Sequence, residues 1–290
     1  ESLLKGAPDK KYVFGVDPAS EVDNFSIVVL EVNADHRKVV HCWTTTRQQH
    51  KDQLRSKIVD EDDFYSYCAK KIRQLMKVFP CVEIALDAQG GGIAVMEALH
   101  DKDKIGEGEL PIWPVIEDKA KDTDDHAGLH ILRLCQFARA DWLAEANHGL
   151  RKDFEDKIVL FPYFDSASLG IALETDKASG RHYDTLEDCV MEIEELKDEL
   201  SMIIMTQTST GRERWDTPEV KTGTGRKSRI RKDRYSSLIM ANMSARLILV
   251  EREMPNHAFG GFAEQNASMF SNDELFQGPA WFTDKIQNLY

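Results

Sequence analysis

The chain has 290 residues, 42% of them hydrophobic, and it carries 37 Lys or Arg against 50 Asp or Glu, for a formal net charge of −13. This length and apolar content suit one large domain or two small ones with a sizeable core. The sequence contains no apolar run of bilayer-spanning length, no signal-peptide pattern at its start and no Cys-x-x-Cys pair among its five cysteines. These features argue against a membrane protein, a secreted disulfide framework and a zinc site, so we expect a cytosolic protein with reduced thiols.

The first part of the chain alternates short apolar runs with stretches of helical periodicity. The predicted strands lie at 12–17, 25–32, 38–44, 81–87, 112–116 and 158–161. The predicted helices lie at 61–79, 93–100 and 129–146. Only short polar breaks separate the first three strands, which indicates an antiparallel meander. The whole order predicts an α/β fold in which helices flank a mixed sheet.

The second part begins with a helix predicted at 184–200, where Asp184 and Glu187 have the spacing of a capping box. A β-hairpin is predicted around Ser209-Thr210-Gly211. The last predicted helix covers 235–250 and is opened by Asp233. We interpret residues 1–11 as the remnant of a linker, 12–252 as one domain and 253–290 as a C-terminal tail.

Positive charge is concentrated in one segment, although the chain as a whole is acidic. Residues 212–234, here called the basic segment, contain nine Lys or Arg and only four acids. Such a segment on an acidic protein indicates contact with phosphate at one place, and a solvated loop is the alternative. The residues expected to hold a nucleic-acid backbone are Arg212, Arg214, Lys221, Arg226, Lys227, Arg229, Arg231, Lys232 and Arg234.

Three carboxylates occupy unusual places in the predicted elements. Asp17 ends the first strand, Asp87 ends the fourth, and Asp233 opens the last helix. Each has an ordinary explanation, as a turn residue, a loop acid or a helix cap. If the two strands are neighbours and the helix crosses their edge, however, the three charges would repel one another and a divalent cation would relieve the repulsion. Oxygen ligands suit Mg²⁺ or Mn²⁺, and two such ions can activate water and stabilise the leaving oxygen of a phosphodiester.

The same motifs resemble a known family. Gly15-Val16-Asp17-Pro18-Ala19 with Asp23, then Ile84-Ala85-Leu86-Asp87 with its glycine loop, then Lys232-Asp233-Arg234-Tyr235, are similar to the nuclease domain of the large terminase subunit of tailed bacteriophages. The resemblance covers roughly residues 12–252, with the three motifs in the family's order. It implies a ribonuclease H-like fold with an added β-hairpin.

The resemblance further implies a metal-dependent endonuclease that cuts concatemeric viral double-stranded DNA during genome packaging. Its catalytic residues would be Asp17, Asp87 and Asp233, which would hold two Mg²⁺ or Mn²⁺ ions, and Asp23 matches an auxiliary metal ligand of some members. The implied partners are DNA, the portal, the small terminase subunit and an ATPase domain that this chain lacks. The implied location is the host-cell cytoplasm, with transient attachment to the viral procapsid.

Other interpretations remain open at this stage. One alternative is a Holliday-junction resolvase or a transposase of the same fold, since resolvases share the Gly-x-Asp-Pro opening. Another is a non-catalytic module that grips DNA or a capsid partner through the basic segment and the tail. His126 and His130 are four residues apart, as in a helical zinc site, but no zinc-protease glutamate accompanies them. Residues 223–228 superficially resemble a phosphate loop without its required spacing.

Overall fold

The computed structural model describes residues 4–18, 23–116, 127–164, 166–178, 183–209, 211–221 and 227–253. By its internal contacts the chain divides into a unit of residues 1–246 and a unit of residues 247–290. The features discussed below belong to the first unit. The predicted C-terminal tail from 254 onward and the loop at 222–226 lie outside the described residues. None of the helices in the described ranges is both long enough and apolar enough to cross a membrane.

A seven-stranded sheet forms the centre of the first unit, in the order β5-β6-β4-β1-β2-β3-β7. Its strands are β1 (Lys11–Asp17), β2 (Phe25–Val32), β3 (Arg37–Thr45), β4 (Cys81–Asp87), β5 (Ile112–Pro114), β6 (Leu129–Cys135) and β7 (Val159–Leu160). The strand β2 pairs antiparallel with β1 and β3, and the other neighbours pair in parallel. The predicted meander and the mixed sheet are therefore confirmed.

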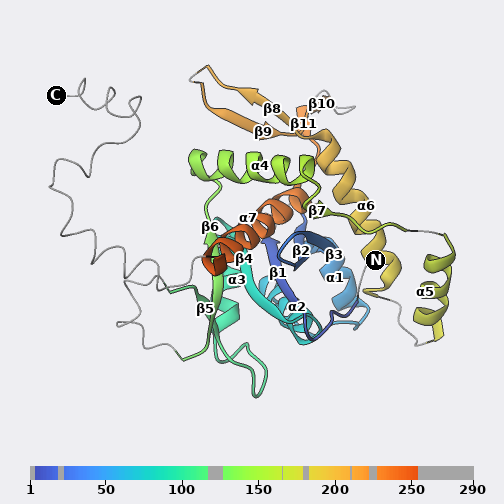
Figure 1. The fold of residues 1–290 in the computed structure, drawn as a ribbon. Coiled ribbons are helices and arrows are strands. Elements are labelled where there is room, and N and C mark those ends of the chain that lie inside the picture. Colours follow the sequence, from blue (N-terminus) through green and yellow to red (C-terminus); the bar gives the residue numbers. More distant parts are fainter. Residues whose placement is uncertain are drawn as a thin grey trace. The chain divides into compact units, whose positions relative to one another are not determined.

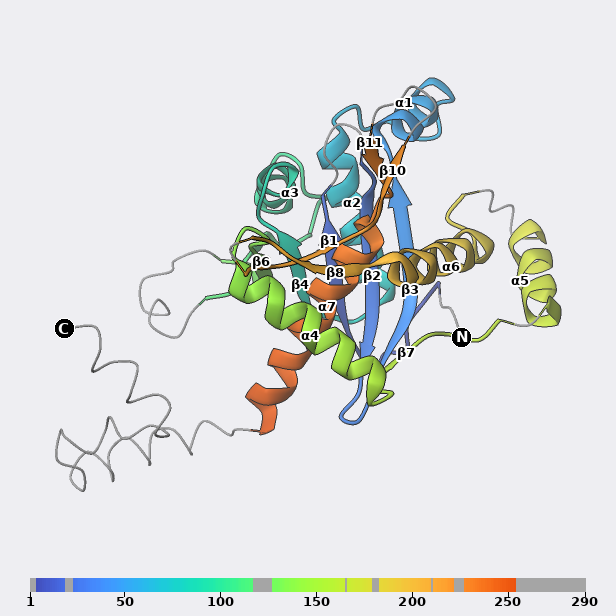
Figure 2. The ribbon, with the colours of Figure 1, turned by 90° about the horizontal axis from the view of Figure 1, so that it is seen from above.

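Helices cover both faces of this sheet. They are α1 (Arg47–Arg55), α2 (Phe64–Val78), α3 (Gly91–His100), α4 (Ala140–Glu155), α5 (Ser166–Ala178), α6 (Leu186–Met202) and α7 (Asp233–Glu253). Figures 1 and 2 show α2 and α3 on one face, while α7, α4 and α6 lie on the other. The α/β class with flanking helices and an added hairpin agrees with the prediction from the sequence.

The alternation of side chains along β1 determines what packs on each face. Tyr12, Phe14 and Val16 are fully buried and point toward the helices α2 and α3. Phe79, at the end of α2, meets the rings of Tyr12 and Phe14 edge-on, at 5.2 and 6.5 Å between centroids. This apolar layer fixes β1 in the middle of the sheet.

On its opposite face, β1 is in direct contact with α7. A Cβ atom added to Gly15 would lie 1.8 Å from the carbonyl oxygen of Ser237 and 2.9 Å from the Cβ of Ala241. Non-bonded atoms do not come this close to a Cβ atom, so only glycine allows α7 to lie at this depth. The mid-strand glycine therefore sets the depth at which the helix sits on the sheet.

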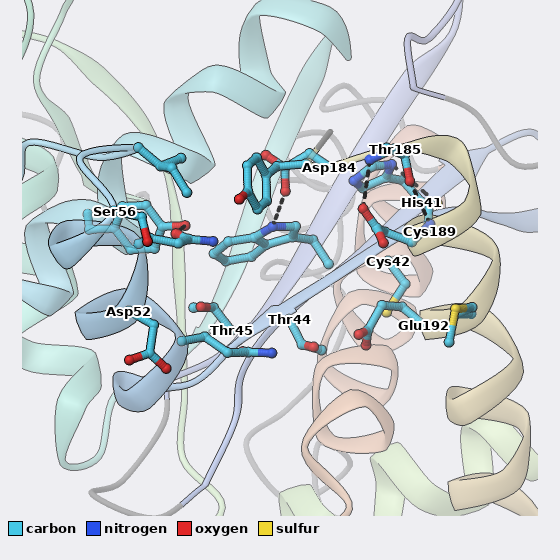
Figure 3. A pocket seen from close by; sticks show the side chains of 18 residues that line it. His41, Cys42, Thr44, Thr45, Asp52, Ser56, Asp184, Thr185, Cys189 and Glu192 are labelled. Carbon is cyan, nitrogen blue, oxygen red and sulfur yellow. Dashed lines mark hydrogen bonds between the residues drawn. The ribbon is translucent and has the colours of Figure 1, made fainter. Parts of the chain in front are cut away.

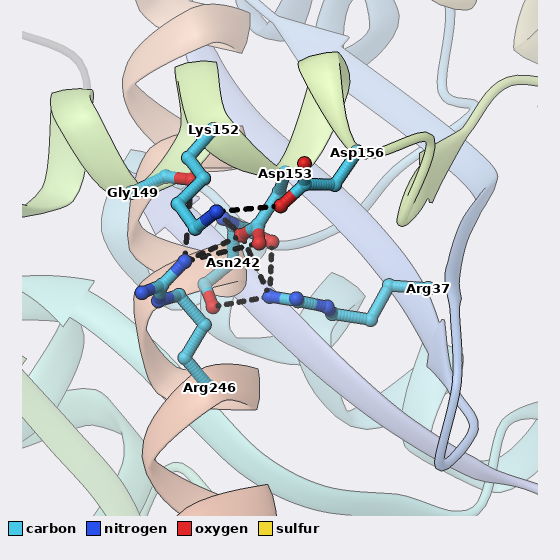
Figure 4. A network of polar contacts seen from close by, with 7 residues as sticks. All are labelled: Arg37, Gly149, Lys152, Asp153, Asp156, Asn242 and Arg246. Atoms are coloured by element: carbon cyan, nitrogen blue, oxygen red, sulfur yellow. Dashed lines mark hydrogen bonds and ion pairs between the residues drawn. The ribbon is translucent and has the colours of Figure 1, made fainter.

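A buried polar network ties the middle of α7 to its neighbours (Figure 4). Asp153 of α4 is 2% exposed and lies 3.0 Å from the guanidinium groups of both Arg37 and Arg246. Asn242 donates to Asp153 at 2.8 Å and accepts from Arg37 at 2.7 Å. Because one interior carboxylate forms ion pairs with two cations, the network holds α4, α7 and the start of β3 in one arrangement.

Several local predictions were wrong. The single helix predicted at 129–146 is the strand β6, a turn in which the Arg139 amide donates to the Gln136 carbonyl, and the helix α4. The apolar residues in 129–135 fit the periodicity of a helix as well as that of a strand. In the structure this segment is a strand, because it pairs in parallel with β4. The helix α6 is capped by Thr185 with Asp188, not by Asp184 with Glu187. The helices α1 and α5 were not predicted.

Two small hairpins complete the described fold. The strands β8 (Ile204–Gln207) and β9 (Glu213–Asp216) pair antiparallel, which confirms the hairpin predicted around Ser209-Thr210-Gly211. The strands β10 (Glu219–Lys221) and β11 (Lys227–Arg229) pair in the same way and were not predicted. Much of the basic segment therefore consists of strands that project from the α4 and α7 side of the sheet (Figure 1).

The contact between Gly15 and α7 can be tested by substitution. Gly15→Ala should lower the free energy of unfolding by about 1–3 kcal/mol, because the helix must move away from the added methyl group. Gly170→Ala is the matched control, since an added Cβ there meets nothing within 4 Å and alanine favours a helix. Urea denaturation followed by circular dichroism measures both changes. Equal stability of Gly15→Ala and the wild type would contradict the close contact.

Candidate active site

The ends of two parallel strands bring Asp17 and Asp87 together. Val16 of β1 pairs with Leu86 of β4, so the next residue of each strand is one of the two acids. Neighbouring strands lie about 4.8 Å apart. Gly15 and Ala85 lie two residues before Asp17 and Asp87. Both face α7, because Gly15 meets Ser237 and Ala85 packs against Met240. The two carboxylates therefore project from the same face and the same edge of the sheet.

Asp233 is the first residue of α7, and Ser237 links it to the end of β1. The Ser237 hydroxyl is fully buried and accepts a hydrogen bond from the Asp17 backbone amide at 3.1 Å. It also lies 3.0 Å from the Ser26 carbonyl and 3.1 Å from the Asp233 carbonyl, and its single proton can serve one of them at a time. One side chain thus joins β1, β2 and the first turn of α7.

Backbone amides hold one carboxylate oxygen of Asp87 and one of Asp233. The Asn24 amide donates to Asp233 Oδ2 at 2.9 Å, and the Gln89 amide donates to Asp87 Oδ1 at 3.2 Å. An added Cβ on Gly92 would lie 1.8 Å from the Asp87 carbonyl oxygen, so the glycine loop lets α3 begin directly against the end of β4. These contacts fix the acids while leaving further oxygen lone pairs for another ligand.

The electrostatics of the three carboxyl groups reflect this crowding. Burial raises the pKa of Asp17 well above its ordinary value of 3.8, and the charges of Asp233 and Asp87 raise it further. A hydrogen bond from the Ser236 hydroxyl opposes the rise. Burial also raises the pKa values of Asp87 and Asp233. The exposed Asp23 contributes to the rise at both Asp17 and Asp233, so its charge acts on the same cluster.

The donor set suits a hard divalent cation, because it consists of carboxylate oxygens with mutual repulsion that a cation would remove. The described residues nevertheless contain no preformed group of three or more His, Cys, Asp or Glu side chains that could hold a metal ion. Like charges that lack a counterion keep apart. Asp17, Asp87 and Asp233 therefore fit a metal by chemistry and by strand placement, and an ion would have to draw them together.

The basic segment contributes to the site unevenly. Arg231 donates to the side chain of Asn24 at 2.7 Å, next to the Asp233 contact, and Lys232 donates to the Trp215 carbonyl at 2.9 Å. Arg212 and Arg214 are exposed on the β8–β9 hairpin. Lys221, Lys227 and Arg229 lie in β10 and β11, and Arg226 lies outside the described residues.

Arg234, which the sequence predicted to contact DNA, is instead buried inside the protein. Only 9% of the residue is exposed, and its guanidinium lies 2.6 Å from Glu192 and 2.7 Å from Glu199. Glu199 also accepts the Tyr235 amide at 2.9 Å and so caps the first turn of α7. Two internal carboxylates therefore engage this cation, and it fastens α6 to the start of α7.

The predicted histidine pair is not a helical motif. His130 lies in β6, where its Nδ1 atom is 3.1 Å from the Pro114 carbonyl oxygen, and His126 lies outside the described residues. Reasoning from sequence also missed Asn24, Ser236 and Ser237, which position the acids. The one available signal was Gly15, because a glycine inside an apolar strand often marks the close approach of another backbone.

Several solved structures are similar to this chain. No protein-family model matches the sequence, and no curated protein matches it. Solved structures similar to the chain include the large terminase nuclease of thermophilic phage G20c with bound magnesium, at 13% identity and a TM-score of 0.49 over 82% of this chain and 84% of that one. The nuclease domain of the Thermus phage P74-26 large terminase has 13% identity and a TM-score of 0.43, over 83% and 82% of the two chains.

The HK97 bacteriophage large terminase is also similar, with 13% identity and a TM-score of 0.45. That match covers 83% of this chain and 40% of the longer phage protein. At such identities the similarity concerns the arrangement of helices and strands alone.

The raised pKa of Asp17 predicts a pH-dependent stability. A carboxyl group whose pKa is higher in the folded state binds its proton more tightly there, so its contribution to stability is full at low pH and is lost as the pH rises through the raised value. In metal-free buffer, Asp17→Asn should therefore be more stable than the wild type at pH 7. The difference should shrink as the pH falls toward about 4, where Asp17 becomes protonated in both states.

Asp141→Asn is the control for this titration. A hydrogen bond from Arg139 lowers the pKa of the exposed Asp141, so this change should slightly destabilise the protein at pH 7. Thermal unfolding between pH 4 and 8 measures both variants. If Asp17→Asn were less stable than the wild type at pH 7, the raised pKa of Asp17 in the folded protein would be contradicted.

Proposed function

We propose that the chain is a metal-dependent nuclease that hydrolyses phosphodiester bonds in double-stranded DNA. The observation that carries the proposal is that three acids from distant parts of the chain lie at one sheet edge, where the charges of Asp233 and Asp87 raise the pKa of Asp17. Asp17 and Asp87 end neighbouring parallel strands, and Asp233 begins the helix that is anchored to the first of them by Ser237. Such a group of crowded carboxyls with raised pKa values at an open sheet edge is typical of a functional site.

In this proposal Asp17, Asp87 and Asp233 hold Mg²⁺ or Mn²⁺, with the exposed Asp23 as an auxiliary ligand. A pair of such ions supplies an activated water and charge stabilisation for the departing oxygen. The charges of both other acids raise the pKa of Asp17, so Asp17 is the member of the cluster that a cation would relieve most. The backbone amides of Asn24 and Gln89 each hold one carboxylate oxygen, of Asp233 and Asp87 respectively, and so limit the rotation of these side chains.

Cations of the basic segment would position the DNA. Arg212 and Arg214 on the β8–β9 hairpin, with Arg231 and Lys232 just before Asp233, can contact phosphates without reading bases. The other basic residues proposed for this role are Lys221, Arg226, Lys227 and Arg229. Arg234 is left out, because its charge is engaged by Glu192 and Glu199.

The finer role rests on the motifs shared with terminase nuclease domains. We propose an endonuclease that cuts concatemeric viral DNA during genome packaging, in the host-cell cytoplasm and transiently at the procapsid. Its partners would then be the portal, the small terminase subunit and an ATPase domain. A resolvase or transposase-like nuclease would use the same acids and differs in its substrate, which makes the choice of DNA the deciding variable.

Plasmid cleavage tests the proposal. The wild-type chain should nick or linearise supercoiled plasmid in the presence of Mn²⁺ or Mg²⁺ and should be inactive in EDTA. Asp17→Asn, Asp87→Asn and Asp233→Asn should each reduce cleavage to background, since each removes an anionic ligand while keeping the shape of the side chain. Asp141→Asn, an exposed acid on α4, should cleave like the wild type.

Two results would contradict the proposal. Retained cleavage by any of the three acid variants would remove that residue from the catalytic group. Tight DNA binding by the wild type without cleavage in either metal would favour a non-catalytic module. Cleavage of four-way junctions but not of linear duplex would keep the chemistry and move the function to junction resolution.

A further inference from the structure

The helix α1 begins at the edge of the sheet that carries the acids. Thr45, the last residue of β3, pairs with Phe25 of β2, and the preceding residue of β2, Asn24, donates its amide to Asp233. Arg47 follows Thr45 by two positions and is the first residue of α1. Figure 3 shows Thr45 beside this helix. Arg47 therefore stands at the same edge of the sheet as the three acids.

Two aromatic rings hold the side chain of Arg47. The central carbon of its guanidinium lies 4.8 Å from the ring centroid of Phe64 and 4.8 Å from that of Tyr65. Phe64 is buried in the core, and Tyr65 leans on the start of α3, since a Cβ atom added to Gly91 would lie 2.6 Å from its hydroxyl. Gly91 follows Asp87 by four residues. Packing thus ties the guanidinium to the elements that carry Asp87.

The guanidinium of Arg47 keeps donors for a further partner. Among the residues that the structure describes, no carboxylate forms an ion pair with it and no acceptor binds it. Its Nε atom is buried without a hydrogen-bond partner, and its two Nη atoms remain accessible. Asp63, at the start of α2, instead accepts from the Ser66 amide at 2.8 Å and from the Ser66 hydroxyl at 2.7 Å. Contact with the ring faces engages the positive charge but uses no N–H donor, so the donors suit an anion.

Arg47 approaches the site from a different element than the basic segment does. Arg231 of the basic segment donates to the Asn24 side chain at 2.7 Å, between β1 and β2, whereas Arg47 follows the end of β3. Two strand spacings of about 4.8 Å separate β1 from β3, so a phosphate at Arg47 would lie roughly 10 Å from one at Asp17. At an axial rise of about 3.4 Å per nucleotide, this corresponds to about three nucleotides along one strand. A strand that is cut at the acids can therefore place a second phosphate at Arg47.

We propose that Arg47 binds a backbone phosphate of the DNA substrate about three nucleotides from the phosphate that is cleaved, and so positions the strand across the acids. Arginine suits this role because its planar donors hold a phosphate through two parallel hydrogen bonds. The rings of Phe64 and Tyr65 fix the group before DNA arrives, which lowers the entropic cost of binding. The proposal rests on the proposed nuclease function and adds a contact that lies outside the basic segment.

DNA binding measured in EDTA tests the proposal, because the DNA then stays intact. Arg47→Met keeps an apolar stem over the two rings and removes the charge. It should bind a fluorescent DNA duplex at least about fivefold more weakly than the wild type at equal salt, as expected for the loss of a charged hydrogen bond. The slope of log affinity against log salt concentration should become shallower by about 0.9, the value of one phosphate contact. Arg47→Lys keeps the charge and should keep the wild-type slope.

Arg151→Met is the matched control. Arg151 is exposed and pairs with Glu155 on α4, near the opposite end of the sheet, where Asp153 meets Arg37. It should bind DNA with the wild-type affinity and slope.

Two results would overturn the assignment of Arg47. One is an unchanged slope in Arg47→Met, even where the wild type cleaves plasmid. The other is an equal loss of slope in Arg47→Lys, because the loss would then follow from altered packing. A shallower slope in Arg47→Met alone, in a chain that cleaves no DNA, would keep Arg47 as a phosphate contact and remove only the nuclease function.

Discussion

The approach of α7 to the middle of β1 is the contact on which the candidate site depends. Gly15 offers no side chain, so the Ser237 carbonyl can lie where a Cβ would otherwise be. At this depth the Ser237 hydroxyl reaches the Asp17 amide, and the first residue of the helix reaches the loop between β1 and β2 through Asn24. A helix that sat farther away would carry Asp233 out of range of the other acids. The architecture of the site is therefore set by one absent methyl group and one hydroxyl.

Crowded carboxylates cost stability, and the fold offsets this with ion pairs at the start and in the middle of α7. At its start, Arg234 joins Glu192 and Glu199 of α6. Further along the helix, Arg246 and Asn242 join Asp153 of α4, which also pairs with Arg37. Breaking such buried pairs leaves an uncompensated charge in the interior, so each strongly resists displacement of the helix. The helix is thereby held against the repulsion that the acids generate among themselves.

Much of this arrangement could be predicted from the sequence. The adjacency of Asp17 and Asp87 followed from two apolar strands that each end in an acid within one α/β pattern, because parallel strands place their carboxyl ends at one edge. The misassigned stretch at 129–146 shows the limit of periodicity, since its short apolar run fits a helix as well as a strand. Ser237 could not be found at all, because its function arises from a contact between residues more than 200 positions apart. The number of charges in the basic segment likewise could not show that Arg234 is buried.

The central claim is that Asp17, Asp87 and Asp233 together form a cation site. Anomalous diffraction from a crystal soaked in Mn²⁺ tests that claim most directly. The account predicts manganese peaks in the space enclosed by Asp17, Asp87 and Asp233, with the side chains drawn together around them. A well-diffracting soaked crystal with no anomalous peak among these three residues would contradict it.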